Sequence, residues 1–92
     1  MRIYKYVLSR VSEQRLLLPP SAKVLCVQAQ HNEPCAWVLL EPGLEKRERL
    51  IRCYGTGHEL PSQPGRYLGT ALLDNGTLVL HYFDADNQPG AA

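Results

Sequence analysis

The chain has 92 residues, of which 45% are hydrophobic and 21% are charged, a composition that indicates one small globular domain and excludes a disordered chain. Its formal net charge is only +1, from 10 basic and 9 acidic residues. It therefore lacks both the basic excess of a nucleic-acid-binding domain and the acidic excess of a nucleic-acid mimic. We do not expect nucleic acid as a direct ligand.

The N-terminal residues and the cysteines predict a cytoplasmic protein. The stretch MRIYKYVLSR has charged and aromatic residues where a signal peptide has its apolar core, and no run reaches the roughly 18 apolar residues of a membrane span. Cys26, Cys35 and Cys53 are an odd number of cysteines without C-x-x-C spacing. We therefore expect reduced, partly buried thiols and no zinc site, with a Cys26–Cys35 bridge left open as an alternative.

Runs of β-branched, aromatic and alternating apolar residues predict strands along most of the chain. They cover Ile3–Leu8, Gln14–Leu18, Lys23–Gln30, Cys35–Leu40, Leu50–Tyr54 and the two arms of a hairpin within Arg66–Phe83. Five consecutive charges from Glu45 to Arg49 interrupt this pattern. Because their signs alternate and no apolar stripe accompanies them, we interpret them as a charged excursion between strands.

The two strands between Lys23 and Leu40 predict a hairpin with a tight turn at His31-Asn32, since both residues tolerate positive φ. Their alternation assigns one set of side chains to the core: Leu25, Val27, Ala29, Ala36, Val38 and Leu40. Trp37 falls on the other face, beside Cys26 and Gln28. An indole beside glutamines indicates a partly wet face or a contact surface.

The stretch Asp74-Asn75-Gly76-Thr77 predicts a two-residue type I′ turn with Asn75-Gly76 at its tip. This turn places Leu73 opposite Leu78, and the same register places Leu72 opposite Val79 and Ala71 opposite Leu80. One face of the hairpin then carries Ala71, Leu73, Leu78 and Leu80, and the other carries Leu68, Leu72, Val79 and Phe83. Because an antiparallel hairpin with one wet face should not be apolar on both, we expect another sheet, the charged excursion or a second subunit to cover the second face.

These elements predict an all-β protein, either a small antiparallel β-barrel or a two-layer sandwich of about six to seven strands built from hairpins. We expect one domain over residues 1–83. The polar segment DADNQPGAA, residues 84–92, is expected to be a flexible C-terminal tail.

The sequence contains no recognisable catalytic constellation. Its serines lie in polar links without a neighbouring histidine, and its histidines show no H-x-H or H-x-x-x-H spacing. His81 lies opposite Thr70 in the predicted hairpin and is most simply a strand histidine that hydrogen-bonds to a hydroxyl. We expect a protein that is not an enzyme and needs no metal or cofactor.

The segment Gly55-Thr56-Gly57-His58 has two interpretations. Backbone N–H groups of a glycine turn can form an anion-binding concavity. Side chains from Arg52, Tyr54, Thr56, His58 and Arg66 would then complete a small-ligand site. The segment lacks the third glycine, the lysine and the following helix of a phosphate loop, so the simpler interpretation is that its glycines lead the chain out of a strand.

Several stretches resemble a family of short phage and prophage proteins described only as a domain of unknown function. The residues that carry the resemblance are IYKY, AKVLCVQAQ, CAWVLLEP, YGTGHELP and LGT…DNGTLVLHYF. It extends from Ile3 to about Phe83 and is most specific over Tyr54–Pro61. Members tend to have Asn-Gly at the position of His31-Asn32, and a polar residue at the position of Leu72. The resemblance implies a phage or prophage origin and transfers no activity.

Three functional hypotheses follow from these features. The first is a phage accessory protein that binds a host protein, such as an inhibitor of a CRISPR or other defence system; Trp37, Leu68, Leu72, Val79 and Phe83 would form its contact surface. The second is a protein that binds or sequesters a nucleotide at the glycine loop. The third is a structural homo-oligomer, in which the apolar hairpin face closes a symmetric dimer.

Overall fold

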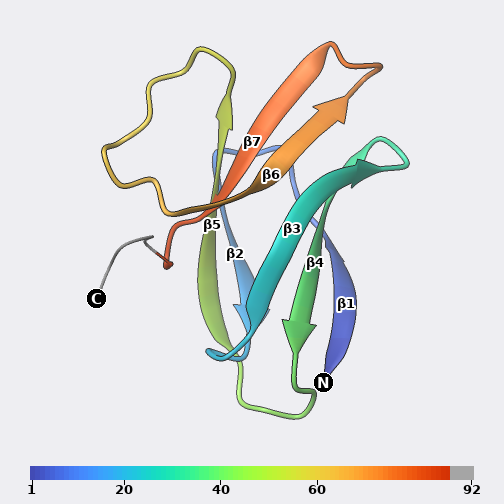
Figure 1. The fold of residues 1–92 in the computed structure, drawn as a ribbon, viewed down its shortest axis with the longest axis vertical. Helices are drawn as coiled ribbons and strands as arrows, with labels where there is room; N and C mark the ends of the chain where they lie inside the picture. The colour runs from blue at the N-terminus through green and yellow to red at the C-terminus, as the bar shows by residue number, and fades with distance from the viewer. Residues whose placement is uncertain (88–92) are drawn as a thin grey trace.

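The computed structural model describes residues 1–87, which contain seven antiparallel β-strands (Figure 1). They are β1 (Arg2–Val7), β2 (Glu13–Leu18), β3 (Lys23–Gln30), β4 (Glu33–Leu40), β5 (Arg47–Gly55), β6 (Arg66–Leu73) and β7 (Leu78–Asp84). These residues contain no helix that could span a membrane. The predicted all-β class is confirmed.

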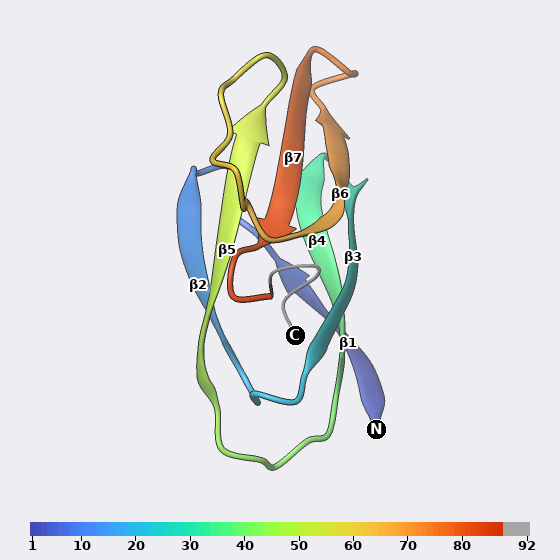
Figure 2. The same cartoon turned by 60° about the vertical axis from the view of Figure 1, so that its left-hand side comes forward.

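The strands form two sheets that pack face to face. One has the order β1-β4-β3 and the other the order β2-β5-β7-β6. The turned view shows the two layers (Figure 2). Buried side chains from both sheets fill the space between them, among them Leu18, Val24, Val27, Ala36, Val38, Leu40, Ile51, Leu68, Ala71, Leu73 and Tyr82. Of the two predicted alternatives, the structure is therefore the two-layer sandwich.

The edge strands β3 and β6 join the two layers on one side, where they run beside each other (Figures 1 and 2). The Arg66 guanidinium of β6 donates a hydrogen bond to the carbonyl oxygen of Val24 in β3. Gly69 has a φ of +151°, and a Cβ at this position would overlap the carbonyl oxygen of Val27. Only glycine allows the two backbones to come this close.

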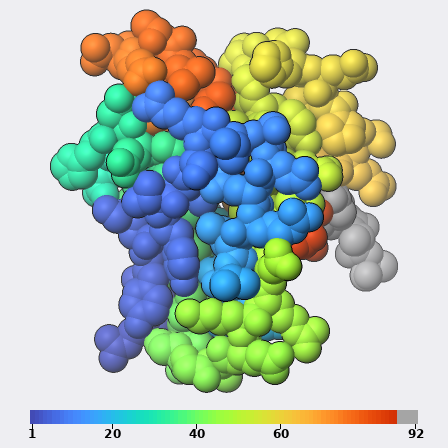
Figure 3. All heavy atoms as spheres, turned by 180° about the vertical axis from the view of Figure 1, so that it is seen from behind, coloured from blue at the N-terminus to red at the C-terminus, as the bar shows by residue number. Residues whose placement is uncertain are grey.

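The opposite side of the sandwich is formed by β1 and β2. Each has a single partner, because β1 pairs only with β4 and β2 only with β5. Seen from behind, these two segments lie at the surface above the loop that joins β4 to β5 (Figure 3). Among the strands of residues 1–87, β3 and β6 thus make the closest contact between the layers.

The predicted register of the β6–β7 hairpin is confirmed, with Leu73 opposite Leu78. The predicted turn bond runs from the Thr77 N–H to the Asp74 carbonyl oxygen at 3.2 Å. A second, overlapping turn bond runs from the Gly76 N–H to the Leu73 carbonyl oxygen at 2.9 Å. Positive φ begins at Asp74, one residue before the predicted tip, and continues through Asn75 and Gly76, so the predicted two-residue turn is too short.

The hairpin of β3 and β4 turns at His31-Asn32 with φ of 53° and 59°, as predicted. Its core assignment is correct for β4 but partly wrong for β3, because a β-bulge between Val24 and Cys26 shifts the register. Leu25 and Ala29, which were predicted to be core residues, are exposed. The extra residue of the bulge reverses the alternation of faces at Leu25. Ala29 shares the face of the buried Val27 but lies next to the exposed turn at His31-Asn32.

A second bulge, between Tyr67 and Gly69, corrects the predicted position of Leu68. Leu68 was expected on the outer surface of the hairpin, but it is buried in the core. Tyr67 takes the outward position opposite Phe83 instead. The bulge lies where β6 meets β3, so Leu68 turns inward at the point of closest approach between the layers.

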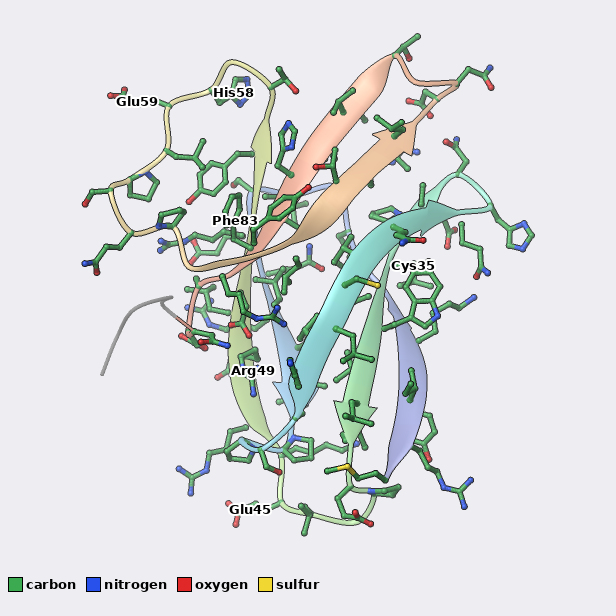
Figure 4. All side chains as sticks on the ribbon, in the orientation of Figure 1. Cys35, Glu45, Arg49, His58, Glu59 and Phe83 are labelled. Carbon is green, nitrogen blue, oxygen red and sulfur yellow. The ribbon has the colours of Figure 1, made fainter. Side chains whose placement is uncertain are left out.

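The predicted charged excursion is wrong for its last three residues, because β5 begins at Arg47. Arg49 points into the sandwich (Figure 4) and its guanidinium binds the carboxylate of Asp84 at 2.9 Å. It also donates to the carbonyl oxygens of Pro20 and Ala22. Asp84 is only 1% exposed, so this ion pair supplies the partner that its buried charge requires.

The predicted tail begins with anchored residues. Strand β7 continues through Asp84, one residue past the predicted end of the domain at 83. The Asp86 carboxylate accepts a hydrogen bond from the Leu50 N–H at 2.8 Å, and the Ala85 N–H donates to the Leu50 carbonyl oxygen at 2.9 Å. The rest of the predicted tail, residues 88–92, lies outside the described residues.

The three cysteines are free, which removes the Cys26–Cys35 bridge. Cys53 lies in the core beside Tyr82, whose hydroxyl donates a hydrogen bond to the Ser9 carbonyl oxygen at 3.0 Å. Burial raises the pKa of the Cys53 thiol and of the Tyr82 phenol. Both groups therefore stay uncharged at neutral pH and act as packing residues.

Three turns that are far apart in the sequence are tied together by Arg10, Asn32 and Asp74, which we call the three-turn clasp. The Arg10 guanidinium binds the Asp74 carboxylate at 3.0 and 3.2 Å and the Asn32 carbonyl oxygen at 2.9 Å. The Asn32 side chain both donates to the Asp74 carboxylate and accepts its backbone N–H. The hydrogen bonds from Arg10 and then Asn32 lower the pKa of Asp74.

Replacing Gly69 should weaken the junction of the two layers. We expect Gly69→Ala to lower the free energy of unfolding by about 3 kcal/mol or more, because left-handed strain and backbone overlap add together. Gly76→Ala is the matched control, since Gly76 also has positive φ but has nothing within 4 Å of an added Cβ. It should cost only about 1–2 kcal/mol. Urea unfolding measures both; equal losses would show that Gly69 makes no required close approach.

The clasp should make stability depend on acid pH. The folded-state pKa of Asp74 lies below its ordinary value of 3.8, so its contribution is complete above that value and is lost as pH falls through the folded pKa. The melting temperature of Asp74→Asn should therefore be lower than that of the wild type at pH 7, and the gap should narrow below about pH 4. Glu45→Gln, at an exposed carboxylate with only a 4.0 Å contact to Arg47, should show no such gap. A gap for Asp74→Asn that is constant from pH 7 to pH 2 would contradict this role.

Candidate functional site

The outward surface of the four-stranded sheet carries a patch of apolar and aromatic side chains, which we call the outer aromatic face. It consists of Tyr54 on β5, Tyr67 and Leu72 on β6, and Val79 and Phe83 on β7. Leu72 is 61% exposed and Tyr67 is 53% exposed. The apolar second face that the hairpin predicts is therefore real, and no part of residues 1–87 covers Leu72 and Tyr67.

Phe83 is the centre of this face. Its ring contacts Tyr54 at a centroid distance of 5.7 Å and Tyr67 at 5.5 Å, with interplanar angles of 75° and 61°. Both contacts are edge-to-face, the arrangement that aromatic rings prefer. The three rings come from adjacent strands, so the sheet holds them in a fixed arrangement rather than as independent, mobile side chains.

A chain of polar side chains crosses the same face. His81 lies between two threonines, with Nε2 at 2.8 Å from the Thr56 hydroxyl and Nδ1 at 2.9 Å from the Thr70 hydroxyl. The Thr70 hydroxyl in turn contacts the Tyr67 hydroxyl. The predicted bond between His81 and Thr70 is confirmed. Its extension to Thr56 links the glycine loop to β7 and β6.

A hollow lies beside the glycine loop at the end of β5. Its volume is about 410 Å³, and it is lined by residues 78–80 of β7, Gly55, Thr56, His58 and Thr77. Figure 4 shows His58 at this end of the molecule and Glu59 pointing outward. The His58 N–H donates to the Gly55 carbonyl oxygen at 3.1 Å, which closes the turn. Two predicted ligand residues, Thr56 and His58, thus meet at a concavity.

The other predicted ligand residues lie elsewhere. Arg52 lies on the outward surface of β5, and its guanidinium is 3.8 Å from the Glu13 carboxylate. Arg66 reaches into the junction of β3 and β6, where it binds Val24. Tyr54 belongs to the outer aromatic face. Neither arginine lines the hollow, so the two cations of the predicted site are not beside its loop.

The predicted contact surface is also divided. Leu72, Val79 and Phe83 share the outer aromatic face, whereas Leu68 is a core residue. Trp37 lies on the outward surface of the other sheet, opposite Lys5 of β1 and Cys26 of β3. The predicted hairpin places Trp37 beside Cys26 in the same way. Trp37 therefore cannot contribute to the same contact as Phe83.

The alternation of residues in the sequence did not predict that Tyr67 faces outward. Strict alternation from the Asn75-Gly76 turn assigns the outward position to Leu68, and the bulge moves it to Tyr67. The available signal was Gly69, because a glycine within a strand often marks a bulge. Among residues 1–87, no group of three or more His, Cys, Asp or Glu residues could hold a metal ion.

The profile of the family described as Domain of unknown function (DUF7352) matches residues 1–91, so the chain belongs to this family. No curated protein and no solved structure matches the chain. Membership thus identifies the family without bringing an activity, a ligand or a partner with it.

Proposed function

We propose that this member of the DUF7352 family is a non-enzymatic accessory protein that binds another protein through its outer aromatic face. The observation that carries the proposal is the packed, outward-facing set of Tyr54, Tyr67 and Phe83, with the uncovered Leu72 on the same face beyond the Thr70–His81 pair. Exposed apolar groups gathered on one face of a small domain are typical of interaction sites.

The composition and rigidity of this face support protein binding. Tyrosine and phenylalanine are enriched at the centres of protein interfaces, because each buries a large apolar area while losing little conformational freedom. The edge-to-face contacts of Phe83 order the rings before a partner arrives. Less entropy is then lost on association.

Charged residues of β2 and β5 border the face and support a specific orientation of the partner. Arg52 lies near Glu13 at 3.8 Å, and Arg15 lies near Glu48 at 3.5 Å. Exposed pairs of this kind contribute little to affinity, but they form a polar rim that disfavours wrong partners. The apolar centre would supply most of the binding energy.

We infer a phage or prophage origin from the resemblance carried by YGTGHELP and the flanking motifs. The partner in this proposal is a protein of the bacterial host in its cytosol, such as a component of a CRISPR complex or another defence system. The nearly balanced charge of the chain supports a protein partner over nucleic acid. Inhibition would follow from occupation of a surface that the host component needs.

Substitution of Leu72 tests this proposal. We expect Leu72→Lys to weaken binding of the host component by about 30-fold or more, the effect of losing one strong interface contact. Leu17→Lys is the matched control, because Leu17 is 60% exposed on β2 of the same sheet but lies outside the outer aromatic face. Partners are captured with the wild type from lysates that carry defined defence systems, then purified and titrated by calorimetry with each variant.

Two results would contradict the proposal. One is equal weakening by Leu72→Lys and Leu17→Lys, which would mean that no specific face is used. The other is a wild-type protein that light scattering shows as a dimer, and Leu72→Lys as a monomer, with no host component bound by either. The outer aromatic face would then be the contact of a symmetric homo-oligomer.

A further inference from the structure

The hollow beside the glycine loop is separate in lining from the outer aromatic face, since only Val79 belongs to both. Its apolar part is made by Leu78, Val79 and Leu80, and Leu78 and Leu80 remain only partly buried although they pack against the core. Its volume of about 410 Å³ lies near the lower end of the range for small-molecule sites. The concavity therefore suits a ligand of one or two rings.

His58 is held at the wall of this hollow by the glycine at the end of β5. Its ring atoms Cε1 and Nδ1 lie 3.0 and 3.2 Å from the position that a Cβ of residue 55 would occupy. A Cβ at this position would be closer than an ordinary van der Waals contact, so the imidazole would have to shift by a few tenths of an ångström. Glycine at 55 thus has a role beyond the turn, because it leaves room for an aromatic, hydrogen-bonding ring beside the hollow.

Thr56 provides a second polar group in a fixed position. Its hydroxyl is held by Nε2 of His81 at 2.8 Å. A hydroxyl has one donor and two acceptor positions, so one bond to His81 leaves capacity for a ligand. Thr56 and His58 therefore place two polar side chains at the rim of a mainly aliphatic concavity, which is the usual composition of a small-molecule site.

The charges around the hollow decide the class of ligand. No arginine, lysine, aspartate or glutamate is among the residues that line it. Arg52 lies near Glu13 and Arg66 binds Val24, so neither is free to bind a phosphate there. A phosphate or other strongly charged group would lose its hydration without gaining a partner. The ligand must be uncharged where it enters the hollow.

We propose that this hollow binds an uncharged planar heterocycle of nucleobase size, with its ring against residues 78–80 and its polar edge toward Thr56 and His58. Contact with these aliphatic residues accepts any such ring, and the two polar side chains orient it. This site is independent of the proposed protein-binding function. Of the nucleotide that the sequence analysis predicts as a ligand, only the base would then be bound, because no group at the hollow binds a phosphate.

A titration followed by two-dimensional NMR tests the site with adenosine and uridine as probes. We expect saturable shifts of the backbone amides of Gly55, Thr56, His58 and residues 78–80, with a dissociation constant in the millimolar range that a ligand of about ten contacting atoms gives. Ribose 5-phosphate, which has the sugar and the phosphate without a base, should cause no shifts at these amides.

Substitutions at the hollow test whether His58 contributes to binding of the nucleoside. His58→Ala should weaken binding of the better probe by about tenfold, as loss of one hydrogen-bonding partner does. Gly55→Ala should produce a smaller loss, because the added methyl requires the same imidazole to shift by only a few tenths of an ångström. Arg52→Gln should leave the affinity unchanged. The amide spectrum of each variant reports whether the fold is retained, and Thr56→Val replaces any variant that does not fold.

Three results would overturn the proposal. The first is the absence of saturable shifts at residues 55–58 and 78–80 with both nucleosides. The second is that ribose 5-phosphate shifts these amides as strongly as the nucleosides do. The third is that Arg52→Gln weakens binding as much as His58→Ala, which would restore a charged site. None of these results bears on the outer aromatic face, whose test is the Leu72→Lys comparison.

Discussion

The close approach of β3 and β6 determines most of what this small sandwich can do. Gly69 allows the backbone of β6 to reach Val27, and Arg66 bonds across the same junction. The bulges on both strands turn Val24 and Leu68 into the core at this point. A short chain thus fills its interior from two sheets without closing a barrel, and the outward surfaces of both sheets remain free for contacts.

Two different surfaces result from this arrangement. The outer aromatic face is ordered by the contacts of Phe83, which suits a protein surface, whereas the hollow near His58 is concave and suits a small molecule. His81 connects them, since its hydrogen bond holds Thr56 at the hollow while its other nitrogen binds Thr70 on the face. A single side chain therefore borders both surfaces.

The sequence predicts the features of this protein that depend on local patterns. Asn75-Gly76 indicates the hairpin and its register because turn chemistry and strand alternation act over a few residues. The inward position of Arg49 and the place of Arg66 could not be predicted in this way, because each binds a partner more than 30 residues away in the sequence, Asp84 for Arg49 and Val24 for Arg66. The bulges interrupt the strand alternation on which the prediction rests, and Gly69 was a signal for the one in β6. The same limit applies to the candidate sites: Thr56 and His58 could be placed together from adjacency, but the absence of arginines could not.

The three-turn clasp has a consequence for the order of folding. Arg10 and Asp74 are 64 residues apart, and Asn32 and Asp74 are 42 apart, whereas the two hairpins that carry these turns are local. Contacts between distant residues carry a larger loop-closure entropy and tend to form after local ones. The clasp should therefore form late, once both hairpins exist, and its loss should speed unfolding more than it slows folding. In that case the clasp mainly slows the unfolding of a structure that its hairpins have already assembled.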